Sequence, residues 1–159
     1  MQSDERASKN KKLTKDSNKL YLFLCIALLV IILDQITKEI VVRYLQNRIP
    51  VIGDVLFMSQ IRNTGAGFGL FQGTNQLMVF LSLCVIGLIL YLYDEIPDKR
   101  NLVVSVALIL GGGVGNLLDR IRLGYVFDFI DLKWWPAFNL ADTAITLGII
   151  GFMYFSWKD

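Results

Sequence analysis

The chain has 159 residues, of which 54% are hydrophobic and only 19% are charged. A soluble globular domain carries about 25% charged residues, and the apolar residues here stand in long blocks, so the sequence predicts a polytopic membrane protein. The net charge of +2 is too small to indicate a nucleic-acid partner. The absence of histidine excludes Ser-His-Asp and Cys-His catalysis and the common zinc sites, and we expect neither a metal nor a cofactor.

Residues 1–19 are mostly polar and contain six of the sixteen Lys and Arg residues. Because this segment cannot bury a core, we expect a flexible basic tail. Residues 20–159 are predicted to form a single membrane domain. Its first apolar run, about residues 20–42, has the length of a transmembrane helix. No small-residue cleavage site follows this run, so we interpret it as a membrane anchor rather than a removed leader.

The segment at about residues 43–73 is interrupted by Pro50 and several glycines around a β-like run at 55–61, which predicts a small β element on the membrane surface. Three further spans are predicted at about residues 76–93, 102–118 and 140–157. Between the last two, residues 120–138 form a predicted surface loop whose Trp134 and Trp135 suit a membrane interface. The predicted fold class is an all-α membrane protein with four transmembrane helices and a small extracytoplasmic β element.

Four spans place both termini on one side of the membrane. The basic N-terminal segment assigns that side to the cytoplasm by the positive-inside rule. The third span then reaches the outer face at Asp119, and the fourth re-enters at Asp142. Carboxylates at the ends of apolar spans lose hydration, so they are candidates for function. We therefore expect these two at the same membrane depth, near the outer face.

Two short polar motifs each have a structural explanation and a functional one. Asp34 and Lys38 are four residues apart on a helix, so they either neutralise each other near the membrane boundary or support a site. Asn63 and Gly65 begin a glycine-rich stretch, which either forms a surface turn or lets the backbone approach another group closely. Neither motif decides between the two explanations by itself.

Two further motifs carry the acids. Asn116, Asp119 and Arg120 share one helix face, and an Asp119–Arg120 pair is disfavoured because adjacent helical residues do not face each other. Asn139 and Asp142 have the spacing of a helix N-cap and its third helical residue, which alone would explain them. The predicted depth of Asp142 nevertheless matches that of Asp119, so we predict that both belong to one site.

Two carboxyl groups held close together can perform the chemistry of an aspartic protease. Like charges a few ångströms apart cannot both ionise easily, so one group keeps its proton. The ionised group takes a proton from water, and the protonated group polarises the scissile carbonyl. A helix C-terminus disfavours and a helix N-terminus favours negative charge, each by about 0.3–1 kcal/mol, so we expect Asp142 as the base and Asp119 as the acid.

Five spaced motifs across about residues 20–157 resemble the lipoprotein signal peptidase (signal peptidase II) family. They are Asp34-Gln35-x-Thr37-Lys38, Asn63-x-Gly65-Ala66, Gly112-Gly113-x-Gly115-Asn116-x-x-Asp119-Arg120, Val126-x-Asp128-Phe129 and Phe138-Asn139-x-Ala141-Asp142. The resemblance implies catalytic roles for Asp119 and Asp142. It implies substrate-binding or site-supporting roles for seven further residues: Asp34, Lys38, Asn63, Gly65, Asn116, Arg120 and Asn139.

The resemblance also implies an activity and a location. The activity is that of a membrane aspartic endopeptidase, which removes the signal peptide from bacterial prolipoproteins just before the diacylglyceryl-modified cysteine. The location is the bacterial cytoplasmic (inner) membrane, with both termini cytoplasmic, a β-cradle outside and the active site near the outer face. The implied partners are the diacylglyceryl-modified prolipoprotein, membrane lipid and the inhibitor globomycin.

Two other classes of protein could use the same residues. A small membrane transporter or proton relay also carries intramembrane acids, but distributes them through the depth of the bilayer. A non-enzymatic membrane scaffold uses polar residues only to hold helices together. Cleavage of a lipid-modified prolipoprotein, lost in Asp119→Asn and in Asp142→Asn, would distinguish the peptidase from both.

Overall fold

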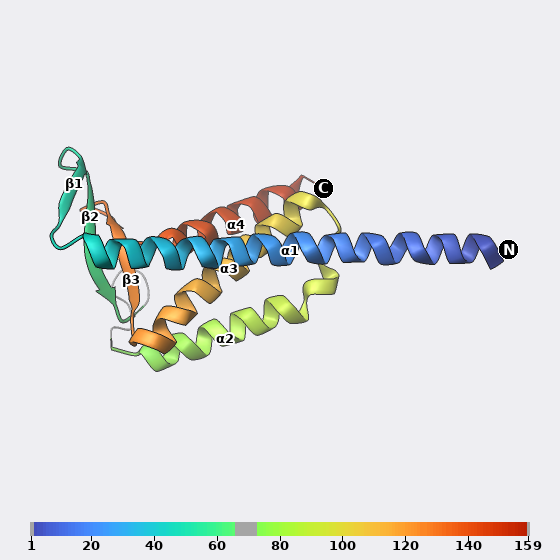
Figure 1. Ribbon diagram of the computed structural model, residues 1–159, viewed down its shortest axis with the longest axis horizontal. Coiled ribbons are helices and arrows are strands. Elements are labelled where there is room, and N and C mark those ends of the chain that lie inside the picture. Colours follow the sequence, from blue (N-terminus) through green and yellow to red (C-terminus); the bar gives the residue numbers. More distant parts are fainter. Residues whose placement is uncertain (1, 66–72, 159) are drawn as a thin grey trace.

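The computed structural model describes residues 2–65 and 73–158, with side chains from Ser17 onward. The helices are α1 (Gln2–Tyr44), α2 (Asn75–Tyr91), α3 (Arg100–Leu123) and α4 (Leu140–Trp157), with a short 3-10 turn, η2 (Tyr93–Glu95), after α2. The strands are β1 (Ile49–Ile52), β2 (Leu56–Asn63) and β3 (Val126–Asp131). The sheet lies at one end of the helices, and α1 extends beyond their other end (Figure 1).

The first helix is longer than the predicted span. It begins at Gln2, so the segment expected to be a flexible tail continues the helix, although only its backbone is described before Ser17. The division of the chain into a tail and one membrane domain stays a prediction. Residues 66–72, which include Ala66 and the rest of the glycine-rich motif, lie outside the described residues.

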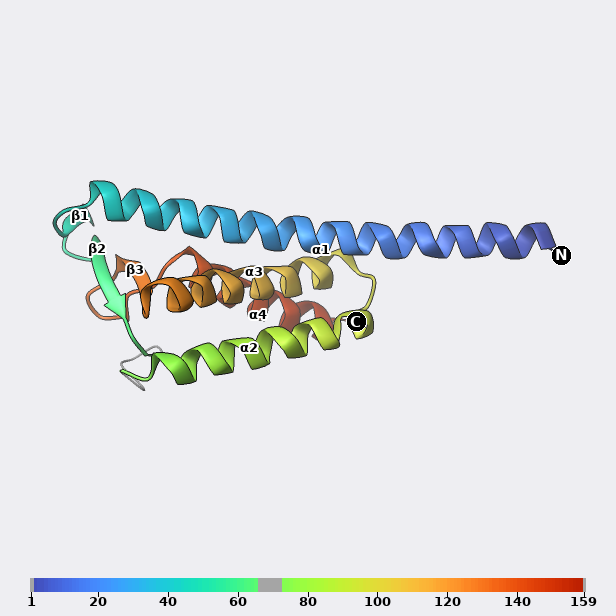
Figure 2. The ribbon, with the colours of Figure 1, turned by 60° about the horizontal axis from the view of Figure 1, so that its bottom comes forward.

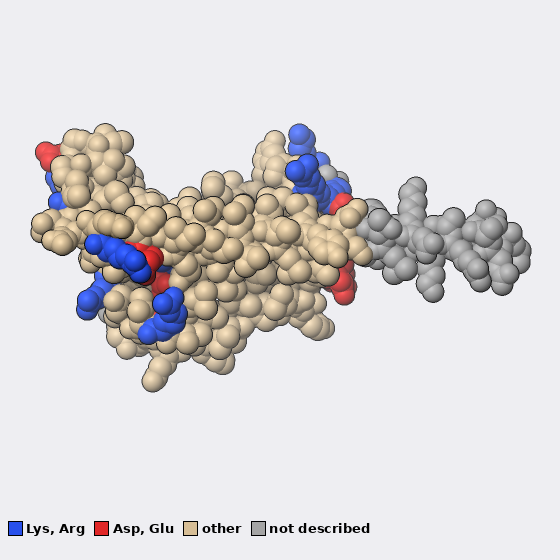
Figure 3. Space-filling view, in the orientation of Figure 1, with Lys and Arg blue, Asp and Glu red and all other residues tan. Residues whose placement is uncertain are grey.

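Three of the described helical segments are long and apolar enough to cross a membrane: residues Ser17–Tyr44 of α1, α3 and α4. The helix α2 is also apolar but has only 17 residues. Along the helices the surface in Figure 3 is nearly free of charged side chains, which gather toward its two ends. Such a surface suits contact with lipid tails, in which an exposed charge is costly. The chain is a multi-pass membrane protein with a small sheet.

The helix α3 lies at the centre and packs against α1, α2 and α4 (Figure 2). Small residues allow this close packing, as is usual between membrane helices. A Cβ atom at Gly111 would stand 2.7 Å from the carbonyl oxygen of Ala27 in α1, and one at Gly148 of α4 would stand 2.6 Å from that of Ser105 in α3. Contact with α1 and α4 therefore fixes the position of the polar end of α3.

The helix α3 continues more than a turn beyond the end predicted near Leu118. It stops at Gly124, whose φ of 82° is left-handed and whose N–H donates to the carbonyl of Arg120 at 3.2 Å. Glycine ends helices in this way because it adopts that conformation without strain. As a result, Arg120 is a helical residue rather than the start of a surface loop, and Asp119 lies within the helix and is only 3% exposed.

The sheet has the order β1-β2-β3, with antiparallel neighbours. The β element predicted at about residues 43–73 is present and supplies β1 and β2. The third strand comes from the segment at 120–138, where the sequence analysis expected only a surface loop; its pairing includes Asn63 opposite Val126. The partner of an edge strand is chosen by contacts between distant segments, which explains why local patterns did not predict β3.

The strand β3 is anchored by its aromatic residues. Phe127 and Phe129 are buried in a cluster with Val41 and Leu45 of α1. Side chains alternate along a strand, so Asp128 points to the opposite face of β3. Because Phe127 and Phe129 pack against α1, the side chain of Asp128 points away from α1 into the interior, where Asp128 is 1% exposed.

Candidate active site

Polar side chains converge where the helices meet the sheet. All nine residues predicted to form the site belong to one continuous network of hydrogen bonds and ion pairs: Asp34, Lys38, Asn63, Gly65, Asn116, Asp119, Arg120, Asn139 and Asp142. Asp128 is a further member of the network. The sequence therefore identified the residues that gather at this end, while their pairing comes from the structure.

Lys38 of α1 holds two carboxylates. Its Nζ lies 2.8 Å from Oδ2 of Asp34 and 2.8 Å from Oδ2 of Asp119, and all three residues are at least 96% buried. The pairing of Asp34 with Lys38 expected from their spacing is present. The other oxygen of Asp34 accepts a hydrogen bond from the backbone N–H of Ala141 at 3.0 Å, which ties α1 to the start of α4. One ammonium thus compensates two buried acids.

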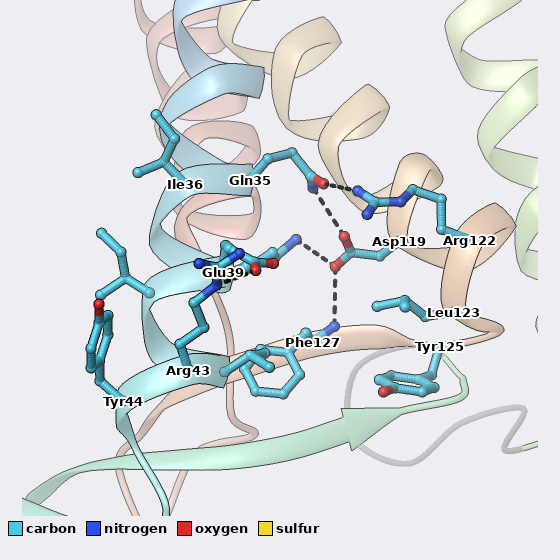
Figure 4. A pocket seen from close by; sticks show the side chains of 13 residues that line it. Gln35, Ile36, Glu39, Arg43, Tyr44, Asp119, Arg122, Leu123, Tyr125 and Phe127 are labelled. Carbon is cyan, nitrogen blue, oxygen red and sulfur yellow. Dashed lines mark hydrogen bonds and ion pairs between the residues drawn. The ribbon is translucent and has the colours of Figure 1, made fainter.

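Both oxygens of Asp119 are engaged by neighbouring groups. Oδ1 accepts from the Nε2 of Gln35 at 2.9 Å, and Oδ2 accepts from the backbone N–H of Phe127 at 3.2 Å in addition to its ion pair with Lys38 (Figure 4). In the described part of the chain no hydrogen bond joins Asp119 to Asp142. Asp119 therefore ties α1 and α3 to β3, and it is not paired directly with the second predicted catalytic acid.

Asp142 opens α4 as the third residue after its N-cap. The Asn139 Oδ1 accepts from the backbone N–H of Asp142 at 2.9 Å, and Oδ2 of Asp142 accepts from the backbone N–H of Asn139 at 3.2 Å. This reciprocal capping box confirms the helix-start pattern seen in the sequence. Oδ1 of Asp142 accepts from Nδ2 of Asn116 at 2.7 Å. The carboxylate is thus held by neutral donors alone among the described residues, and the residue is partly exposed.

Asp128 of β3 shares a partner with Asp142. Its Oδ1 accepts from the Nδ2 of Asn139 at 2.8 Å, and its Oδ2 accepts from the Nδ2 of Asn63 at 3.0 Å. Burial, followed by repulsion from the negative charge of Asp142, raises the pKa of Asp128 to about 7. This acid stands in one of the five family motifs, but no role was predicted for it. Its place within a short apolar strand was the signal that it would be buried.

Two cavities share Trp135, Phe138 and Asp142 in their walls. The first has a volume of about 190 Å³ and is polar on one side, where Asn63 and Arg120 line it. The second has a volume of about 270 Å³ and is mainly apolar; Thr143, Thr146 and Leu147 complete its lining. Asp142 therefore stands where a polar cavity and an apolar cavity meet, an arrangement suited to a ligand with both characters.

Arg120 points toward the turn that follows β2. Its Nη2 donates to the carbonyl of Gly65 at 3.3 Å, while the N–H of Gly65 donates to the Oδ1 of Asn63 at 3.1 Å. Arg120 and Asn63 thus fix the same turn from two sides. Within the described segments, no group of three or more His, Cys, Asp or Glu residues is arranged to hold a metal ion.

Comparison with known proteins decides the family. The family model described as "Signal peptidase (SPase) II" matches residues 26–158. The chain belongs to the signal peptidase II family. Membership makes the chain a peptidase, and it agrees with the resemblance found in the five sequence motifs.

Several curated relatives of this chain carry the name lipoprotein signal peptidase. The protein of Moorella thermoacetica is 45% identical over 131 residues, which cover 80% of this chain and 87% of the relative. That of Syntrophus aciditrophicus is 44% identical over 143 residues, or 82% of this chain and 89% of the relative. A solved bacterial membrane enzyme is 29% identical with a TM-score of 0.80, covering 86% of this chain and 88% of that one. The helices and the small sheet are therefore arranged as in a known membrane enzyme.

Proposed function

We propose that this chain is an aspartic endopeptidase of the bacterial cytoplasmic membrane, which removes the signal peptide from prolipoproteins just before the diacylglyceryl-modified cysteine. Membership of the signal peptidase II family and the shared name of the relatives support this function. The observation that carries it is the pair of carboxyl groups of Asp128 and Asp142, which share the partner Asn139 beside two cavities.

We assign the catalytic pair to Asp128 and Asp142, where the sequence had suggested Asp119 and Asp142. The charge of Asp119 is compensated by its ion pair with Lys38, and both of its oxygens accept hydrogen bonds from neighbouring groups, whereas Asp128 has no ion pair among the described residues. Asp128 feels the charge of Asp142 directly, which is the coupling that two catalytic carboxyls need. In this assignment Asp119 is a positioning residue, because it holds the helix that carries Asn116 and the strand that carries Asp128.

The two acids divide the chemistry between them. A pKa of about 7 lets Asp128 hold a proton near neutral pH, so Asp128 is the acid and Asp142 the base. Asp142 takes a proton from a water molecule, whose oxygen attacks the scissile carbonyl carbon while Asp128 protonates the carbonyl oxygen. When the tetrahedral intermediate collapses, Asp142 gives its proton to the leaving amine and the intermediate returns one to Asp128. Both carboxyls regain their starting states.

The layout in the membrane follows from the helices. We propose four crossings, with both termini in the cytoplasm and the site near the outer face. The 17 residues of α2 span about 26 Å at 1.5 Å per residue, close to the ~30 Å of the hydrocarbon core. At the sheet end, Trp134 and Trp135 are 71% and 48% exposed, as expected for residues at a membrane interface.

The apolar cavity beside Asp142 suits the lipid-bearing part of the substrate. Leu147 in its lining is 57% exposed on the outer surface of α4, so the cavity borders the lipid-facing side of the protein. A diacylglyceryl-modified cysteine can therefore reach the carboxyl pair from within the bilayer. Globomycin, the inhibitor implied by the family, is expected to compete for the same place.

Cleavage in a defined membrane tests this function. The purified chain in proteoliposomes should release the signal peptide from a diacylglyceryl-modified prolipoprotein. The same precursor without the lipid, as a matched control, should remain uncleaved. A wild-type chain that leaves the modified precursor intact would contradict the proposed function.

A further inference from the structure

One of the four glycines at the centre of α3 differs from the others in its surroundings. Gly111, Gly112 and Gly115 pack directly against α1 or α4, and a Cβ atom at any of them would collide with that helix. At Gly113 the nearest heavy atom would be Cγ1 of Ile86 in α2, at the ordinary contact distance of 3.8 Å. Gly113 is also partly exposed. Packing among the described residues therefore explains three of these glycines but does not require a glycine at position 113.

Gly113 shares one face of α3 with two residues of the candidate active site. Asn116 and Arg120 follow it at the i+3 and i+7 positions, which lie on the same side of a helix. Both residues line the polar cavity that contains Asp142. Three helical residues span about 4.5 Å, so Gly113 lies about one turn below Asn116, on the side of the bilayer. The face of α3 that Gly113, Asn116 and Arg120 form thus leads from the cavity down along the helix.

The proposed cleavage reaction requires an apolar partner below the site. A signal peptide carries an apolar stretch of roughly 7–15 residues before its cleavage site. When the scissile bond lies at Asp128 and Asp142 near the outer face, this stretch has to run from the carboxyl pair into the bilayer. In lipid it forms a helix, because its backbone groups must be satisfied internally. Such a helix is about 10–22 Å long and extends past the level of Gly113.

We propose that the apolar helix of the signal peptide docks on this face of α3, with its backbone closest to Gly113 and with α2 beside it (Figure 2). A small residue lets the backbones of two membrane helices approach closely, which strengthens their packing. A fluid acyl chain adapts to side chains of any size, so a glycine favours a helix over a lipid as the occupant. This inference rests on the proposed function, and it assigns the part of the substrate that precedes the cleaved bond.

Cleavage kinetics of glycine variants in proteoliposomes test the docking face. Gly113→Leu should raise the KM for the diacylglyceryl-modified prolipoprotein about tenfold, and leave kcat and the melting temperature close to the wild-type values, because the new side chain blocks substrate binding but not packing within the chain. Gly113→Ala, which adds one methyl group, should have a smaller effect on KM. Gly87→Leu is the matched control, because Gly87 is an exposed glycine of α2 whose Cβ atom would also meet nothing within 4 Å. This control should keep the wild-type KM.

Crosslinking locates the apolar segment directly. A precursor with a photoreactive leucine analogue in this segment, bound to the Asp142→Asn chain so that it stays uncleaved, should crosslink to α2 and to the part of α3 around Gly113. Adding Gly113→Leu should weaken these crosslinks. Cleavage by the wild-type chain is measured in parallel, and its absence would contradict the proposed function itself. With wild-type cleavage present, the docking face is overturned if Gly113→Leu keeps the wild-type KM, if Gly87→Leu raises the KM equally, or if the crosslinks map to α1 instead.

Discussion

Two pairs of aspartates lie at the same end of the helices in opposite electrostatic settings. Asp34 and Asp119 stand on either side of Lys38, at 2.8 Å from its ammonium. Asp128 and Asp142 have no ion pair among the described residues, and the side chains that donate to them are amides. Asp34, Asp119 and Asp128 are buried and Asp142 is partly exposed, and the two pairs differ in the compensating charge.

This difference separates structure from chemistry. A buried acid that is paired with a cation strengthens the contacts between elements, and breaking the pair is costly. A buried acid that has only amide donors and a negative neighbour keeps its proton to a higher pH, which is the property of a catalytic acid. Asp119 and Asp128 are nine residues apart in the chain, and only Asp119 forms an ion pair among the described residues. Four experiments test this difference between the two pairs.

The largest effect is expected from removing the acid of the proposed pair. Asp128→Asn keeps the size of the side chain but cannot transfer a proton, so cleavage should slow by about 10²–10⁴-fold. Asp119→Asn leaves the Lys38–Asp34 ion pair intact, and it should lower stability while the folded fraction retains activity with an unchanged pH profile. Initial rates and thermal unfolding of both variants provide the measurement. An Asp119→Asn variant that is as stable as the wild type but inactive would reverse the assignment.

The second effect concerns the compensated pair. Lys38→Met leaves two buried carboxylates, Asp34 and Asp119, without a compensating cation. It should reduce the free energy of unfolding by about 3–5 kcal/mol. Adding Asp119→Asn removes one of the two uncompensated charges and should restore part of the lost free energy of unfolding. Thermal unfolding in detergent compares the two variants. A Lys38→Met chain with wild-type stability would show that these ion pairs do not stabilise the fold.

The third effect is the dependence of stability on pH. The folded-state pKa of Asp128, about 7, lies above its ordinary value of 3.8, so the folded chain binds this proton more tightly than the unfolded chain does. The stabilisation is complete below about pH 4 and disappears as the pH rises through about 7, with an upper limit of about 4 kcal/mol. The chain has no histidine to obscure this range. The melting temperature should fall between about pH 4 and 7, and less steeply in Asp128→Asn; parallel curves would contradict the assignment.

The smallest effect is expected at an exposed pair. Glu39 and Arg43 form an ion pair at 2.6 Å, but their side chains are 56% and 67% exposed. Water and salt screen such a pair, so Glu39→Gln should change the free energy of unfolding by less than about 0.5 kcal/mol. Comparing its thermal unfolding with that of Lys38→Met tests whether burial, rather than the presence of an ion pair, controls stability. A loss as large as that of Lys38→Met would refute this explanation.

Features that depend on neighbours along the chain could be predicted from the sequence. Long apolar runs predicted helices where α1, α3 and α4 are found. The spacing of Asn139 and Asp142 predicted a capping box, and that of Asp34 and Lys38 predicted a pair on one helix face. These patterns are local, because the geometry of a single helix decides which side chains meet.

The partners of each acid depend on contacts between distant segments, which the three-dimensional structure reveals. Lys38 reaches Asp119 because α1 packs against α3, and Asp128 reaches Asn139 because β3 joins the sheet and buries its two phenylalanines against α1. Desolvation and the position of the nearest charges determine the behaviour of a carboxyl group. Both depend on segments far apart in the chain. The sequence could therefore place Asp34, Asp119 and Asp142 in one site, but it could not show that Lys38 holds Asp34 and Asp119 or that Asp128 shares Asn139 with Asp142.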